Sequence, residues 1–73
     1  MEKKIWHNYD EPTDPKKEVL VEWDGLGETY HDVGYFNKEV NAVRVAGGAY
    51  IFLGKGDRWA YIEDLVKATL TDF

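Results

Sequence analysis

The chain has 73 residues, a formal net charge of −5 and no cysteine. A chain this short supports a single hydrophobic core, so we expect one domain over residues 1–73, without disulfides or a thiolate zinc site. No stretch approaches the roughly 20 apolar residues of a membrane span, and no apolar run near the start suits a signal peptide. These absences predict a cytoplasmic protein without membrane association.

The negative charge is concentrated in the first half of the chain. Residues 1–37 hold nine acidic residues against four lysines, whereas residues 38–73 hold five acidic and five basic residues. Nucleic-acid binding depends on clustered Lys and Arg side chains, so this balance argues against direct contact with nucleic acid. It favours a basic protein surface as a charged partner.

The first long elements are predicted to form a hairpin. Ahead of them, Trp6 stands alone in a polar segment, and we expect it to anchor a loop against the core. Residues 18–24 (EVLVEWD) alternate apolar and acidic side chains, which predicts a strand. The following glycines supply a reversal, and residues 29–36 (TYHDVGYF) return as the second strand. Within that strand, Gly34 indicates a bulge or a close approach of two backbones.

A second hairpin is predicted farther along the chain. Residues 40–46 (VNAVRVA) lead into Gly47-Gly48, a dipeptide that suits a tight two-residue turn. Residues 50–53 (YIFL) follow as the partner strand, and their apolar side chains suggest a strand that is covered on both faces.

The stretch "RWAYIEDL" is predicted to change from strand to helix. Residues 58–61 read as a last short strand, and from Ile62 the apolar residues recur at helical spacing. We expect Trp59 and Ile62 to close the end of the sheet, with a short helix covering one face. Arg58 and the acids of the first helical turn, Glu63 and Asp64, are expected to face water, since the helix dipole favours acids there. The three Trp, five Tyr and three Phe are expected to fill the interior.

Together these elements predict an α+β domain that is mostly β. Its architecture is a small twisted antiparallel sheet of four or five strands with a short C-terminal helix. The alternative is an SH3-like partly closed barrel, which needs a strong bend near Gly34.

Three short motifs give the chain a resemblance to bacterial sequences. They are Trp6-His7 followed by Glu11-Pro12, the strand Val19-Leu20-Val21, and Trp59-Ala60-Tyr61 with Asp64-Leu65. With these motifs the chain resembles small uncharacterised proteins of Bacteroides-type genomes and prophages, which share a domain of unknown function. The resemblance implies a compact domain of mobile-element origin and supplies no catalytic residues.

The sequence offers little for catalysis. It has neither Cys nor Ser to act as a nucleophile. The acid–base candidates are His7 with a neighbouring acid and His31 with Asp32, and a metal site would need His7, Asp10, Asp14 and His31 to converge. A His beside an acid is common on protein surfaces, so we predict a protein that is not an enzyme and needs no metal or cofactor. A small hydrolase using His7 and His31 is the disfavoured alternative.

We expect the protein to act by contact with another protein. The window from residue 18 to residue 37 contains no Lys or Arg, and its acids, together with two tyrosines that could stay exposed, are the predicted binding residues. They are Glu18, Glu22, Asp24, Glu28, Asp32, Tyr30 and Tyr35. On the predicted hairpin the first three acids share a solvent face, with Asp32 on or near the same face of the next strand.

Three interpretations of these residues remain open. The acids could only solubilise the domain, or they could mimic nucleic-acid charge and inhibit a host DNA-binding protein or nuclease. The tyrosines could instead form an aromatic platform that binds a peptide or a second copy. We expect a monomer or a weak homodimer, since short edge strands invite pairing.

Overall fold

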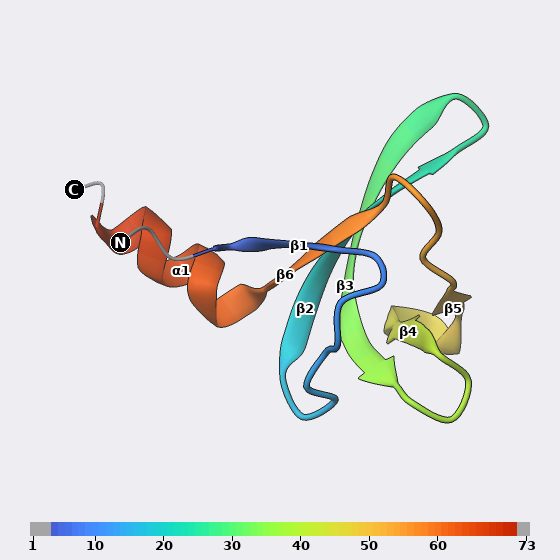
Figure 1. Cartoon of the computed structure of the whole chain (residues 1–73), viewed down its shortest axis with the longest axis horizontal. Helices are drawn as coiled ribbons and strands as arrows, with labels where there is room; N and C mark the ends of the chain where they lie inside the picture. Colours follow the sequence, from blue (N-terminus) through green and yellow to red (C-terminus); the bar gives the residue numbers. More distant parts are fainter. Residues whose placement is uncertain (1–3, 72–73) are drawn as a thin grey trace.

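The structure, a computed structural model, describes residues 4–71. Figure 1 shows a strongly twisted sheet with one helix projecting from its end. The elements in chain order are β1 (Trp6–Asn8), β2 (Glu18–Gly25), β3 (Glu28–Asn37), β4 (Ala42–Val45), the 3-10 turn η1 (Ala46–Gly48), β5 (Tyr50–Ile51), β6 (Arg58–Tyr61) and α1 (Ile62–Thr71).

The strands form one antiparallel sheet in the order β1-β6-β2-β3-β4-β5. The predicted α+β class, mostly β with a short C-terminal helix, is confirmed. The sheet has six strands instead of four or five, because residues 6–8 add β1 beside β6. The sheet is open, so the alternative of a partly closed SH3-like barrel does not describe it.

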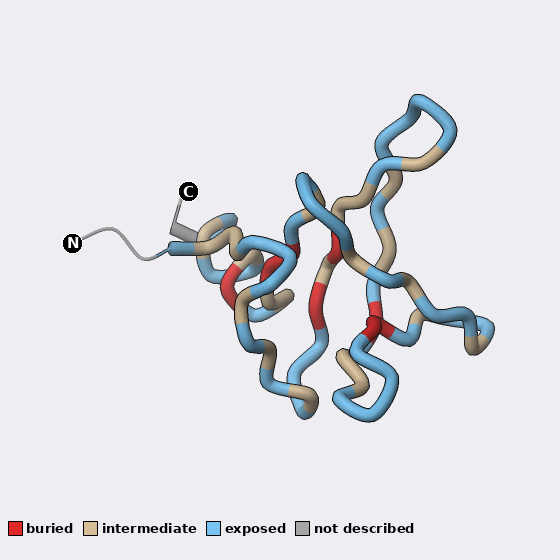
Figure 2. The backbone as a smooth tube through the Cα atoms, turned by 45° about the vertical axis from the view of Figure 1, so that its right-hand side comes forward, coloured by how far each residue is buried: buried red, intermediate tan, exposed pale blue. Residues whose placement is uncertain are grey.

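The core lies on one face of the central strands. Its fully buried large side chains are Val19, Val21, Val43 and Trp59, and six partly buried hydrophobic residues pack around them. The buried backbone in Figure 2 accordingly follows the middle of the sheet. The expectation that aromatic rings fill the interior is correct for Trp59, which is 1% exposed, but wrong for Phe52, which is 67% exposed.

Gly34 provides the close backbone approach that the sequence indicates. It is buried in β3 opposite Val45 of β4. A Cβ at this position would lie 2.0 Å from the carbonyl oxygen of Arg44, which is far inside van der Waals contact. Only glycine therefore allows β3 and β4 to pair in this register.

The second hairpin turns differently from the prediction. The Val45 N–H donates to the carbonyl of Ala49 at 2.9 Å, which leaves three residues, Ala46 to Gly48, in the connection instead of two. Gly47 and Gly48 both adopt positive φ angles, so the dipeptide serves the turn as expected.

The strand-to-helix change falls where the sequence places it, at Ile62. The helix, however, projects from the end of the sheet and does not cover a face (Figure 1). Its apolar stripe is consequently open toward the far end, where Leu70 is 65% exposed. The prediction for Asp64 is also wrong: this carboxylate is 6% exposed, because the third helical residue turns toward the body of the protein.

Within residues 4–71 no helix is long and apolar enough to cross a membrane.

Candidate functional site

The β2–β3 hairpin projects away from the rest of the molecule, and its tip is the candidate site (Figure 1). The strands remain paired up to Gly25 and Glu28, so only Leu26 and Gly27 form the turn. Their φ angles are 52° and 81°, as in a type I′ turn, whose twist suits a two-residue hairpin. That turn type prefers Asn-Gly, so a leucine at its first position is unusual.

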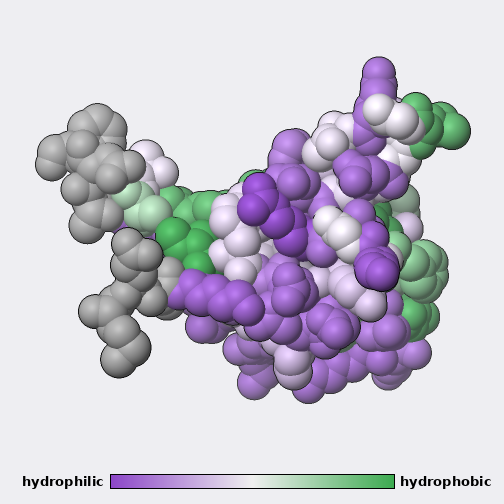
Figure 3. All heavy atoms as spheres, turned by 45° about the horizontal axis from the view of Figure 1, so that its top comes forward, coloured by the Kyte–Doolittle hydropathy of each residue, from purple (hydrophilic) through white to green (hydrophobic). Residues whose placement is uncertain are grey.

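Leu26 has no structural reason to be there. Its side chain is 100% exposed, and the left-handed backbone region is unfavourable for a residue with a bulky side chain. Figure 3 shows a hydrophobic area at the hairpin tip, next to hydrophilic residues of the hairpin. A single exposed leucine is ordinary on a protein surface, but one that holds its backbone in the left-handed region is a candidate for contact with something outside the domain.

An aromatic pair stiffens the hairpin behind its tip. The rings of Trp23 and Tyr30 face each other across the strands, with centroids 4.8 Å apart at 27°. The indole N–H of Trp23 donates to Asp32 at 2.8 Å, and the Tyr30 hydroxyl donates to Glu28 at 3.1 Å. A Cβ on Gly25 would lie 2.9 Å from the indole, so the ring leans over the strand end. The tip is therefore held in a fixed shape before any contact forms.

The tip is also negatively charged. Asp24 accepts a hydrogen bond from the Thr29 hydroxyl at 2.8 Å, and Glu28 accepts the one from Tyr30. Both donors are neutral hydroxyl groups, so neither hydrogen bond pairs these acids with a basic side chain. Both residues are exposed, and no Lys or Arg lies between residues 18 and 37. A basic surface would therefore complement the rim around Leu26.

Glu22, farther from the tip, already forms an ion pair within the domain. Its carboxylate accepts from the Arg58 guanidinium at 3.0 and 3.1 Å and lies 3.2 Å from Nε2 of His31. The hydrogen bond from Arg58, followed by that from His31, lowers the pKa of Glu22 below its usual value. This acid is thus less available to an external basic group than Asp24 or Glu28.

The structure divides the predicted acidic set between the two faces of the sheet. Glu18, Glu22 and Asp24 share the outer face, as expected from their alternation in β2. Asp32 lies on the opposite face, because it pairs with Val21 and residues directly opposite in a ladder project from the same side. Glu28 pairs with Gly25 on that same inner side. The predicted placement of Asp32 beside the β2 acids is therefore wrong.

The two predicted tyrosines do not form one platform. Tyr30 is partly buried against Trp23, whereas Tyr35 pairs with Glu18 on the outer face and is exposed. They are five positions apart in one strand, so their side chains leave opposite faces.

The two histidines are also held apart. His7 stacks on the buried Trp59, with ring centroids 4.4 Å apart, and its Nδ1 lies 3.6 Å from Glu11. His31 lies on the outer face beside Glu22. Residues 4–71 contain no group of three or more His, Asp or Glu side chains placed to hold a metal ion.

A shallow pocket of about 430 Å³ lies between the β1–β2 connection and the β3–β4 end of the sheet. Its apolar wall is formed by Phe36, Val43 and Leu53. Acids and a lysine line the same pocket, with Asp10 and Lys38 among them. Their charges oppose each other, and the pocket defines no single ligand chemistry.

Sequence reasoning missed Leu26. The letters "GLGE" indicate a reversal, but the left-handed leucine follows only when the register leaves two residues for the turn.

Family models, curated proteins and solved structures were compared with this chain, and none of them matches it.

Proposed function

We propose that this domain is a non-enzymatic accessory protein that acts by protein–protein contact, with the tip of the β2–β3 hairpin as its contact site. The observation that carries the proposal is Leu26, fully exposed at a positive φ angle on a rigid projecting turn. A single apolar side chain at the end of such a turn fits a small apolar pocket on a partner.

The charge of the tip narrows the partner. Asp24 and Glu28 flank Leu26 and are not neutralised by a basic side chain within residues 4–71. The partner we propose is therefore a protein whose apolar pocket is rimmed by Lys and Arg. Its basic groups would add to the association rate and to specificity, and salt would weaken the contact.

The alternative function, mimicry of nucleic-acid charge to inhibit a DNA-binding protein or nuclease, has less support. Mimicry needs carboxylates spaced along one surface, whereas Asp32 and Glu28 lie on the face opposite to Glu18, Glu22 and Asp24. The Glu22 carboxylate is also already engaged in hydrogen bonds with Arg58 and His31. The location of the protein in the cytoplasm and its mobile-element origin stay predictions.

The test compares two single substitutions in an affinity capture from a bacterial lysate. Leu26→Asn removes the apolar tip and introduces Asn-Gly, the sequence that type I′ turns prefer, so the domain should fold at least as well. As the control, Leu70→Asn removes another exposed leucine, which is 65% exposed in the helix. We expect wild type and Leu70→Asn to capture the same partner protein with similar affinity. Leu26→Asn should bind that partner at least about tenfold more weakly, which is the loss typical of a central contact residue.

The response to Leu26→Asn separates the two candidate functions. Salt should weaken both a contact centred on Leu26 and charge mimicry, but Leu26→Asn should abolish only the first and leave charge mimicry unchanged. If every captured protein binds wild type and Leu26→Asn equally, the hairpin tip is not the contact site.

A further inference from the structure

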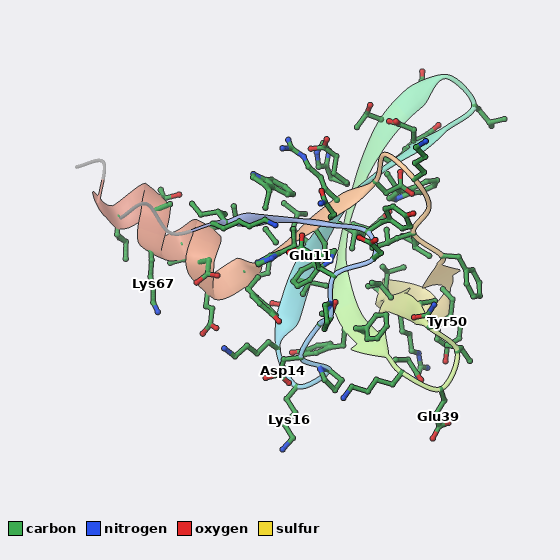
Figure 4. The ribbon with its side chains drawn as sticks, viewed as in Figure 1. Glu11, Asp14, Lys16, Glu39, Tyr50 and Lys67 are labelled. Carbon is green, nitrogen blue, oxygen red and sulfur yellow. The ribbon has the colours of Figure 1, made fainter. Side chains whose placement is uncertain are left out.

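The β5 strand is a free edge of the sheet and carries unexplained apolar exposure. It pairs with β4 on one side only. Along residues 50–53 the burial alternates: Ile51 and Leu53 pack against the core, whereas Tyr50 and Phe52 are 40% and 67% exposed. Figure 4 shows Tyr50 at this edge, and Figure 3 shows hydrophobic residues on the side of the molecule where β5 lies.

The hydrogen-bond pattern fixes which backbone groups of β5 point outward. Val45 and Ala49 are opposite residues joined by a hydrogen bond, so they form a hydrogen-bonded pair. Such pairs alternate with non-hydrogen-bonded pairs in an antiparallel ladder. Tyr50, opposite Arg44, is therefore in a non-hydrogen-bonded pair, and its N–H and C=O point away from β4. Ile51, opposite Val43, is in a hydrogen-bonded pair, so its groups point toward β4. Phe52 follows the last residue of β5, and continuing the extended backbone by one residue directs its N–H and C=O outward.

Apart from the shortness of β5, this edge lacks the usual protection against pairing. Exposed edges are commonly blocked by charged side chains, proline or a bulge. The segment from residue 46 to residue 54 (AGGAYIFLG) contains neither proline nor any charged residue, although 32% of the whole chain is Asp, Glu, Lys or Arg. An incoming strand would meet no charge from this segment, although Arg44 of β4 pairs with Tyr50 and lies on the same face.

We infer that β5 pairs antiparallel with β5 of a second copy of this chain, about a twofold axis at Ile51. In that register Tyr50 of each copy lies opposite Phe52 of the other. Both residues present outward N–H and C=O groups, so each of the two pairs forms two hydrogen bonds. The exposed rings of Tyr50 and Phe52 then meet across the strands, a pairing that stabilises antiparallel sheets.

The two exposed rings select a second copy as the occupant. In a twofold pairing the exposed Tyr50 of one copy covers the exposed Phe52 of the other, so the same segment supplies both halves of the contact. Each copy carries a net charge of −5, so like-charge repulsion limits the affinity, and we expect a weak dimer that salt strengthens. This salt response is opposite to that expected for the acidic hairpin on a basic partner.

The experiment measures molar mass by analytical ultracentrifugation of the whole chain over a wide concentration range at two salt concentrations. Wild type should shift from monomer to dimer as concentration rises. Phe52→Pro removes two of the four hydrogen bonds and both phenyl rings without touching a bond to β4, and it should raise the dissociation constant at least about tenfold. Phe52→Ala, which keeps the N–H, should have a smaller effect, and Leu26→Asn should have none. A strict monomer at every concentration, or a dimer that Phe52→Pro leaves unchanged, overturns the inference.

Hydrogen exchange on the wild-type protein supplies a second readout, so the conclusion does not depend on the folding of a variant. The Ile51 amide, bonded to β4, should exchange slowly at all concentrations. The Tyr50 and Phe52 amides should exchange fast in dilute solution and become protected as concentration rises. Equal exchange of these two amides at low and high concentration would contradict the pairing.

Discussion

At the scale of single residues, Gly34 is the position that most directly determines the sheet. It allows the β3 backbone to approach the Arg44 carbonyl of β4 more closely than any side chain permits. We predict that Gly34→Ala destabilises the domain by about 3 kcal/mol or more, because the Cβ would meet rigid backbone atoms and force the two strands apart. Urea denaturation followed by tryptophan fluorescence measures the loss.

The chain offers a matched control for this substitution. Gly54 lies at an ordinary φ angle, and the nearest atom to a Cβ there is a carboxylate oxygen of Asp57 at 3.9 Å. Gly54→Ala should therefore change stability by less than about 0.5 kcal/mol, as surface substitutions usually do. Equal stability of the two variants would show that the β3–β4 approach is not a constraint on folding.

At the scale of elements, β6 fastens the N-terminal part of the chain to the sheet. The Trp59 indole N–H donates to the Asn8 carbonyl at 3.0 Å, and the Tyr61 hydroxyl accepts from the Asp14 N–H at 3.0 Å. Lys17 adds an ion pair to Glu63 at the start of α1, at 2.7 Å. The irregular connection between β1 and β2 is thus held by side chains of the strand and helix that end the chain.

The Tyr61 hydroxyl gives a prediction at this scale. Tyr61→Phe should leave the fold intact, lower stability by about 1 kcal/mol, and speed hydrogen exchange of the Asp14 amide and its neighbours. Tyr50→Phe, which removes an exposed hydroxyl, is the control. Unchanged exchange around Asp14 in Tyr61→Phe would show that this hydrogen bond does not hold the connection.

The sequence predicts those elements whose patterns are local. Residues 18–24 alternate over a full strand, and the period changes visibly at Ile62, so both boundaries could be read directly. β1 has three residues, too few to show a period, and its pairing with β6 joins distant parts of the chain. The burial of Asp64 and the opposite faces of Asp32 and Glu22 depend on helix rotation and strand register. Leu26 depends on the length of one turn, which only the register determines.

At the scale of the whole molecule, acid should loosen the attachment of β1. Glu11 accepts hydrogen bonds from Lys4 and from the backbone N–H of Asn8, and these, in that order, lower the pKa of Glu11 from 4.5 to about 2. Because the pKa is lower in the folded state, ionised Glu11 stabilises folding above about pH 4.5. That contribution declines as pH falls toward 2 and is absent below it.

Glu11→Gln should therefore be less stable than wild type at neutral pH and approach it in stability as the pH is lowered from about 4.5 to 2. Urea denaturation at a series of pH values gives the difference. Glu39→Gln, which changes a carboxylate that makes no ion pair within residues 4–71, is the control. A constant difference between wild type and Glu11→Gln at all pH values would refute the assignment.

The first described residues and the far end of α1 lie on the same side of the molecule, opposite the β2–β3 hairpin (Figures 1 and 2). A tag, a surface anchor or a fused domain joined at either terminus would therefore point away from Leu26 and from β5. The domain can be immobilised or displayed through its ends in one common orientation. Both proposed contact surfaces then stay accessible in a single sensor or display format.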